Sequence, residues 1–152
     1  MASTSHRSAD ADAVDLSSRL RLAIARMARR LRQEAGTDLS AALTSALATV
    51  EGQGPLTPSE LAEAERVQRP TATRILDRLG ERGLVARTPD PADRRSSLVT
   101  ITPEGQALLR RLRGRKNAYL ARRLRELEAA DIEALERAAD VLERMLESER
   151  RP

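Results

Sequence analysis

The chain has 152 residues, with 27 Lys and Arg, 23 Asp and Glu and one His, and its formal net charge is +4 at pH 7. It contains no Cys, Trp or Phe and a single Tyr, which excludes disulfides, thiolate metal sites and thiol redox switches. The core must therefore consist of Leu, Ala, Ile, Val and Met, a mixture that favours helix over sheet. No apolar run approaches membrane-spanning length and residues 1–15 lack the apolar stretch of a signal peptide, so we expect a cytoplasmic protein.

Charge is distributed unevenly along the chain. Residues 66–95 hold eight Arg against four acids, and residues 110–125 hold seven Arg and one Lys with no acid. Residues 126–149 reverse this balance, with nine acids against two Arg. Such a separation suits a protein in which one face meets a polyanion.

The first third of the chain predicts a tail and two helices. Residues 1–12 are small and polar, and we predict that they are disordered. The first helix has Leu or another apolar residue at helical spacing, at Leu16, Leu20, Ile24, Met27 and Leu31, and stops near Gly36. The second repeats the pattern at Leu39, Leu43 and Leu47, and the Gly- and Pro-rich residues 52–55 end it.

A short third helix is predicted by its N-terminal signals. Thr57 stands at the N-cap, Pro58 occupies the first helical position, and Glu60 lies three residues after the cap. This is the pattern of a reciprocal capping box, in which each side chain accepts a hydrogen bond from the other residue's backbone N–H. The helix is expected to run to about residue 64.

The fourth predicted helix spans about residues 69–82, buries Ile75 and Leu79, and ends at Gly83 in the left-handed conformation. Polar side chains able to bond base edges or phosphates lie off the apolar stripe, namely Gln68, Arg69, Thr71, Thr73 and Arg74. Scattered arginines usually form an ordinary solvated face. The preceding capping box and the following hairpin favour DNA contact instead, and we add Arg78 to this set.

A hairpin follows, with short strands over residues 84–87 and 97–101. Its tip contains Arg94 and Arg95, which could be plain solubilising charge. A β-wing beside a recognition helix, however, reaches the adjacent minor groove, where narrow A·T tracts attract arginine. Asp90 and Asp93 are close enough to suggest a metal site, but the neighbouring prolines and arginines favour a turn.

Two longer helices are predicted to complete the chain, one opening near Pro103 and the other at Asp131. Their apolar stripes, like that of residues 13–35, are too extensive to stand alone, and the first and last helices lie at opposite ends of the sequence. We therefore expect a two-fold helical interface. The alternative is a monomer with the stripes folded inward. The basic run at 110–125 is interpreted as a solvated face rather than a second DNA site.

Residues 57–105 resemble the winged helix of the MarR family, the multiple antibiotic resistance regulators. The family's wing carries Asp-x-Arg-x-x-x-Val-x-Leu-Thr, and this chain matches it, with Ile for Leu, at Asp93, Arg95, Val99, Ile101 and Thr102. The resemblance implies a mainly α fold with a small β-wing (α+β). It implies one domain over residues 13–152, with the winged helix-turn-helix at about 39–105 and dimerisation helices at about 13–35 and 106–150.

The turn before the fourth helix departs from the family pattern. Relatives usually show Leu-Gly-Val-Ser where this chain has residues 65–68, Glu-Arg-Val-Gln. Without the Gly, Arg66 occupies a position that often needs a left-handed backbone, at a cost of about 1 kcal/mol if that conformation is kept. Without the Ser, Gln68 makes a poorer N-cap. Either the turn is rebuilt or the cost is accepted, and both Arg66 and Gln68 become available to DNA.

The resemblance also implies roles for single residues. It assigns the minor-groove contact to Arg95 and makes Asp77 its salt-bridge partner, with Asp93 also orienting the wing. It places an effector cavity between the dimer helices and the winged helix, which candidate residues Met27, Leu31, Leu43, Leu47 and Tyr119 could border. Tyr119 is as well explained by core filling.

We expect a sequence-specific DNA-binding transcriptional regulator that binds a pseudo-palindromic operator as a homodimer. The resemblance alone implies repression and a small-molecule effector that weakens DNA binding. The alternative is a winged helix used for protein interaction or architecture without sequence preference. An enzyme is not expected, because the only imidazole is His6 in the N-terminal tail. Neither a cofactor nor a metal is expected.

Overall fold

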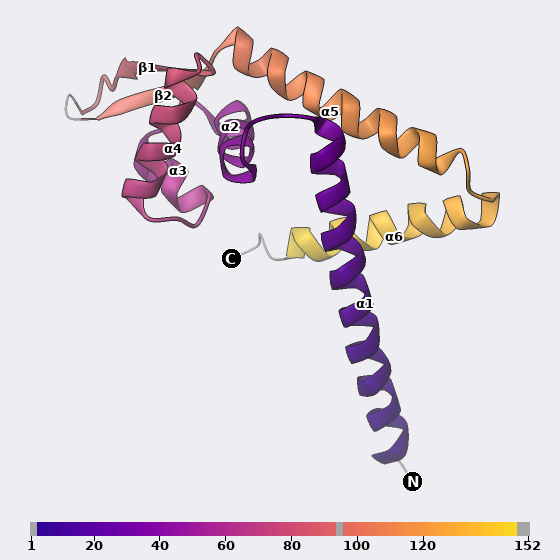
Figure 1. Ribbon diagram of the computed structural model, residues 1–152. Helices are drawn as coiled ribbons and strands as arrows, with labels where there is room; N and C mark the ends of the chain where they lie inside the picture. The colour runs from indigo at the N-terminus through magenta and orange to yellow at the C-terminus, as the bar shows by residue number, and fades with distance from the viewer. Residues whose placement is uncertain (1–2, 94–95, 149–152) are drawn as a thin grey trace. The chain divides into compact units, whose positions relative to one another are not determined.

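The computed structural model describes residues 3–93 and 96–148. In these residues the elements are, in order, α1 (Ser3–Ala35), α2 (Ala41–Gln53), α3 (Pro58–Ala64), α4 (Arg69–Glu81), β1 (Val85–Pro89), β2 (Ser97–Ile101), α5 (Pro103–Leu124) and α6 (Ala129–Ser148) (Figure 1). This confirms a mainly helical fold with a small antiparallel wing. The chain divides into two compact units, residues 1–116 and 117–152.

The core of the first unit lies in the winged helix. Residues of α2, α3, α4 and β2 meet there, and the largest fully buried side chains are Leu47, Leu61, Leu76, Leu79, Val50 and Val99. Each buried leucine contributes about 1.5–3 kcal/mol relative to an exposed one. Within the described residues no polar or charged side chain is buried. The winged helix therefore closes its core with aliphatic side chains alone.

Helix α4 buries a slightly different stripe from the one predicted. Ala72, Leu76 and Leu79 are buried, at spacings of four and three residues that place them on one face. Ile75 is only partly buried and packs against the edge of this core. The helix ends as expected, with Gly83 at φ 67° and the Leu84 backbone N–H donating to the Leu79 carbonyl at 3.0 Å.

The wing is an antiparallel hairpin in which Val85 pairs with Ile101 and Pro89 pairs with Ser97. The first strand runs two residues further than predicted. Leu56, which precedes α3, adds a short bridge to Val99, with N–H to carbonyl distances of 3.1 and 2.8 Å. This bridge joins the base of the wing to the entrance of the helix-turn-helix.

Helix α1 begins at Ser3, which differs from the disorder that we predicted for residues 1–12. The segment contains neither Pro nor Gly, the two residues least favourable within a helix. The helix ends as predicted before Gly36, which has φ 57°. The Arg115 guanidinium of α5 donates to the carbonyls of Ala35 and Gly36 at 2.8 and 3.1 Å, so α5 holds the C-terminus of α1.

Apolar side chains remain exposed on the flanking helices. On α1 these are Leu16, Leu20, Leu22, Ile24 and Met27, and on α6 they are Leu135, Val141, Met145 and Leu146. Of the helices in the described ranges, none is both long enough and apolar enough to pass through a membrane. The described parts of α1 and α6 are amphipathic, with apolar side chains exposed along one stripe of each.

Candidate nucleic-acid interface

The helix-turn-helix begins with the predicted capping box. The Thr57 hydroxyl accepts the Glu60 backbone N–H at 3.2 Å, and a Glu60 carboxylate oxygen accepts the Thr57 backbone N–H at 2.6 Å. The hydrogen bond from the Thr57 backbone N–H, together with one from the Thr57 hydroxyl, holds the pKa of Glu60 below its ordinary value. Pro58 stands in the first turn of α3. The start of α3 is thus fixed by residues within one helical turn.

The turn between α3 and α4 keeps the left-handed backbone despite the missing glycine. Arg66 has φ 52°, and the Val67 backbone N–H donates to the Ala62 carbonyl at 2.9 Å, as in a Schellman ending. Gln68 is the N-cap of α4 and makes no side-chain capping bond. Of the two alternatives left open for this turn, the structure shows the retained left-handed conformation, and the weak cap at Gln68 is as expected.

Sequence reasoning missed a cross-link that reaches this turn from α2. Ser45 and Thr49 both donate their hydroxyls to the Glu65 carboxylate, at 2.8 and 2.5 Å. Donors and acceptor are 20 and 16 residues apart, and no local pattern in the sequence connects them. Only the packing of α2 against the helix-turn-helix brings them together.

Helix α4 and the turn before it expose most of the polar residues predicted to contact DNA. Gln68, Arg69, Arg74 and Arg78 are exposed, as is Arg66, whereas Thr71 and Thr73 are half-buried. The Thr73 hydroxyl donates to the Arg69 carbonyl at 3.0 Å, so its hydrogen goes to its own helix. None of the described ion pairs involves Arg69, Arg74 or Arg78. Among the residues that the structure describes, the outward face of α4 thus presents cations without a carboxylate partner.

Two other arginines of the winged helix are held by carboxylates. Arg82, at the end of α4, pairs with Asp38 at 2.6 Å, and the pKa of Asp38 is lowered by this hydrogen bond and by the charge of Arg82. Arg87 of β1 pairs with Asp77 of α4 at 2.7 Å. Both pairs are exposed and contribute little stability, but they tie α4 to the α1–α2 loop and to the wing.

We predicted Arg95 as the partner of Asp77, and Arg95, like Arg94, lies outside the described residues, so that pair stays a prediction. Within the described residues the partner is Arg87, which the sequence analysis did not single out. Strand β1 contacts α4, so Arg87 comes within reach of Asp77 from the base of the wing.

Asp90 and Asp93 form part of the hairpin turn. An Asp90 carboxylate oxygen accepts the Ala92 backbone N–H at 2.8 Å, the arrangement of an Asx-turn. The Asp93 carbonyl accepts the Ser96 backbone N–H at 2.9 Å. These contacts support the turn interpretation over the metal interpretation for this pair.

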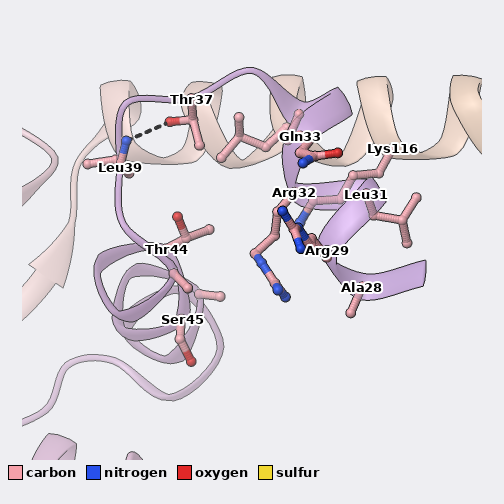
Figure 2. Close-up of a pocket in the computed structure, with 14 residues that line it drawn as sticks. Ala28, Arg29, Leu31, Arg32, Gln33, Thr37, Leu39, Thr44, Ser45 and Lys116 are labelled. Atoms are coloured by element: carbon pink, nitrogen blue, oxygen red, sulfur yellow. Dashed lines mark hydrogen bonds between the residues drawn. The ribbon is translucent and has the colours of Figure 1, made fainter. Parts of the chain in front are cut away.

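A cavity of about 720 Å³ lies beside α1, α2 and α5 in the first unit (Figure 2). Its apolar lining includes Leu31, Leu39, Ala48 and Leu112, and its polar lining includes Thr44 and Ser45. Arg29, Arg32 and Lys116 also line it, and no carboxylate does. Thr37 lies at its edge, where its hydroxyl accepts the Leu39 backbone N–H at 3.1 Å.

Of the five residues suggested for an effector cavity, only Leu31 lines this one. Leu43 and Leu47 belong to the winged-helix core, because α2 turns that face toward α4 and its residues 41, 44, 45 and 48 toward the cavity. Met27 is 45% exposed on α1. Tyr119 lies in the second unit, where the guanidinium carbons of Arg122 and Arg123 are 5.7 and 5.9 Å from its ring centroid.

Comparison with known proteins places residues 39–97 in a match to the MarR family. An HTH-type transcriptional regulator of Mycobacterium bovis is 37% identical over 134 residues, covering 88% of this chain and 93% of that protein. The multiple antibiotic resistance protein MarR of Salmonella typhimurium is 34% identical over 100 residues, covering 65% of this chain and 69% of its own length.

Solved structures extend the likeness beyond the winged helix. A transcriptional regulator from Pseudomonas aeruginosa superposes with a TM-score of 0.82 at 29% sequence identity. The match covers 89% of this chain and 96% of the other. Shared architecture therefore includes the flanking helices as well as the DNA-binding motif.

Proposed function

This chain belongs to the MarR family and is a DNA-binding transcriptional regulator, and we propose that it represses transcription by binding a pseudo-palindromic operator as a homodimer. The observation that carries the proposal is the outward face of α4, where Arg69, Arg74 and Arg78 have no ion-pair partner among the described residues. Repression would follow from occlusion of the promoter. The protein would act in the cytoplasm, where bacterial DNA lies.

Helix α4 would enter the major groove. Gln68 and Arg69 stand at its N-terminal end, the part of a recognition helix that contacts base edges. Glutamine can bond the N6 and N7 edge of adenine, and arginine can fork onto guanine. Thr71 would bond a base or a phosphate, and Thr73, whose hydroxyl hydrogen is donated to the Arg69 carbonyl, would accept a hydrogen bond from a base. Arg66, Arg74 and Arg78 would bind phosphates on either side. Sequence reading would thus be concentrated at the start of α4.

The wing would lie along the neighbouring minor groove. Arg94 and Arg95 at its tip would enter that groove, where narrow A·T tracts concentrate negative potential. The Asp77–Arg87 ion pair supports this, because it joins α4 to the base of the wing. Asp93 would help to shape the hairpin around the tip. The two DNA-contacting elements would then approach the duplex at one set angle.

The homodimer would be formed by the flanking helices. Two apolar stripes support a dimer. On α1, Leu16 and Ile24 are 52% and 50% exposed, and on α6, Met145 and Leu146 are 57% and 63% exposed. Such surfaces mark interaction sites in proteins that remain in solution. A two-fold dimer would present its recognition helices to major grooves about 34 Å apart.

The cavity beside α2 would hold a small-molecule effector that weakens DNA binding. Its volume falls within the range of about 300–1,000 Å³ that ligand sites occupy. Three cations and no carboxylate line it together with aliphatic side chains. The chemistry that fits this lining is an apolar body carrying a negative charge.

Binding to specific and scrambled DNA over a range of salt concentrations tests the proposal. Fragments selected from genomic DNA would supply the operator, and a scrambled duplex of the same length and composition would be the control. A regulator should favour the operator by about 10³-fold or more at physiological salt. Equal affinity for both duplexes at every salt concentration would instead support an architectural or protein-interaction module.

A further inference from the structure

A carboxylate in the helix-turn-helix is held at both oxygens by one helix of the core. Ser45 and Thr49 lie one turn apart on α2, and their hydroxyls donate to Glu65 Oε2 at 2.8 Å and Oε1 at 2.5 Å. Hydrogen bonds to an ionised carboxylate are stronger than those between neutral groups. We call these three residues the Glu65 clamp.

The clamp acts at the point where the turn is strained. Glu65 is the residue that ends α3, and Arg66 follows it with φ 52°. A non-glycine residue persists in the left-handed region only where its surroundings hold it there. The Glu65 side chain supplies such a restraint directly before Arg66, and α4 begins three residues after it.

From these contacts we propose that Glu65 is a positioning residue for operator recognition. The clamp fixes the α3–α4 turn to α2, and so sets the direction in which Gln68 and Arg69 leave that turn. Gln68 makes no side-chain capping bond, so the start of α4 lacks that form of local support. The restraint from α2 replaces it.

The clamp also reaches the cavity. Ser45 is one of the lining residues drawn in Figure 2, and its hydroxyl is a donor to Glu65. A molecule in the cavity that engages this hydroxyl would leave one Glu65 oxygen without its donor and loosen the turn. Ser45 is therefore the link between cavity and recognition helix, and this part of the inference rests on the proposed effector function.

The positioning role is tested by comparing substitutions of Glu65, which ends α3, and of Glu63, which lies within α3. Glu65→Ala and Glu63→Ala each remove one negative charge beside DNA, and Glu63 is exposed with no described hydrogen bond from its side chain. Loss of charge alone raises affinity for any DNA. We expect Glu63→Ala to bind the operator as well as the parent or better, and Glu65→Ala to bind it about tenfold more weakly.

Two further readouts separate positioning from general structural damage. Glu65→Ala should change affinity for scrambled DNA by no more than about twofold, and Glu65→Gln, which keeps an acceptor, should recover most of the operator affinity. If Glu65→Ala melts too early to be assayed, Thr49→Val combined with Ser45→Ala removes both donors and leaves Glu65 in place. Operator binding by Glu65→Ala as tight as by Glu63→Ala, or by the donor double variant as tight as by the parent, would overturn the inference.

The link through Ser45 is tested with 1-anilinonaphthalene-8-sulfonate, an anionic aromatic probe whose fluorescence rises in apolar sites. Ala41→Leu, which fills the cavity from an exposed position on α2, serves to locate the probe. At saturating probe the ratio of operator affinities with and without it measures the coupling between the two sites. We expect a ratio of about tenfold in the parent and near one in Ser45→Ala.

Thr44→Val is the matched control for Ser45→Ala. Thr44 also lines the cavity, but its hydroxyl donates to the Ser40 carbonyl at 3.1 Å and does not contact Glu65. It should keep the parental ratio. A probe that binds the cavity and weakens the parent and Ser45→Ala equally would overturn the link alone. A probe that does not bind, or whose binding Ala41→Leu leaves unchanged, would overturn the proposed effector site and the link with it, while the Glu65 comparison stands.

Discussion

The winged helix and the flanking helices differ in the burial of their apolar residues. In the winged helix Leu61, Leu76 and Leu79 are fully buried by other parts of the same unit. On α1 and α6 comparable residues stay exposed, with Leu16 at 52% and Leu146 at 63%. The winged helix thus has its own core, whereas the flanking helices expose apolar surface of the kind that marks interaction sites.

The largest effect should come from opening the winged-helix core. We expect Leu76→Ala to lower the free energy of unfolding by about 3 kcal/mol, because it removes a fully buried side chain and leaves a cavity. Val14→Ala, at a position 66% exposed on α1, should cost about 0.5 kcal/mol or less. Urea denaturation measures both. Equal losses would contradict the contrast between the two regions.

Substitutions on the flanking helices should weaken dimer association rather than folding. We expect Leu135→Glu, which puts a charge into the proposed dimer interface, to weaken the dimer by about 100-fold. Circular dichroism should show that the helices remain. Sedimentation equilibrium at micromolar concentration gives the dissociation constant, and Arg137→Ala on the same helix is the control. An unchanged dimer would mean that α6 does not contribute to the interface.

Within the winged helix, substitutions of the exposed residues Gln68 and Arg74 should affect DNA binding in different ways. Gln68→Ala should lose roughly 1–3 kcal/mol of binding free energy for the operator and little for scrambled DNA, because base contacts carry specificity. Arg74→Ala should weaken binding to both duplexes and reduce the slope of log affinity against log salt by about 1, as expected for one phosphate contact. Salt titrations with both duplexes measure this. If both variants act equally on both duplexes, α4 does not read sequence.

A smaller effect is expected at the strained turn. Arg66→Gly should raise the free energy of unfolding by about 1 kcal/mol, because glycine adopts φ 52° without the penalty of a side chain. Arg66→Ala removes the same charge but keeps the strain, so it should not stabilise. Both variants should bind DNA more weakly if Arg66 contacts phosphate. Thermal melts and binding to scrambled DNA separate the two consequences.

The smallest effect should be pH-dependent. Arg82 lowers the pKa of Asp38 in the folded chain, so the stabilisation from this pair is present above the ordinary aspartate pKa of about 3.9 and fades as the pH falls through the lowered value. Asp38→Asn should therefore melt slightly below the parent at pH 7. This difference should shrink when the pH drops below about 4. A difference that stays constant with pH would exclude the charge of Asp38 as its cause.

Local signals in the sequence predicted the local structure well. The capping box at Thr57 and Glu60 and the left-handed Gly83 are confirmed, whereas the sequence left open whether Arg66 would be left-handed. Each depends on backbone geometry within a few residues, where the chemistry of single side chains decides the outcome. On α4 the predicted burial of Leu79 is confirmed, but Ile75 is only partly buried and Ala72 and Leu76 complete the buried stripe.

The sequence by itself determined that this chain carries a helix-turn-helix, a wing and apolar flanking helices, because caps, turns and periodicity act over short separations. Tertiary structure alone decided that Asp77 meets Arg87, that Asp38 meets Arg82 across 44 residues, and that Glu65 receives hydroxyls from 16 and 20 residues away. It also decided which face of α2 forms the core and which borders the cavity. Both faces of that helix carry small or apolar residues at helical spacing, so only the elements packed against them distinguish the two.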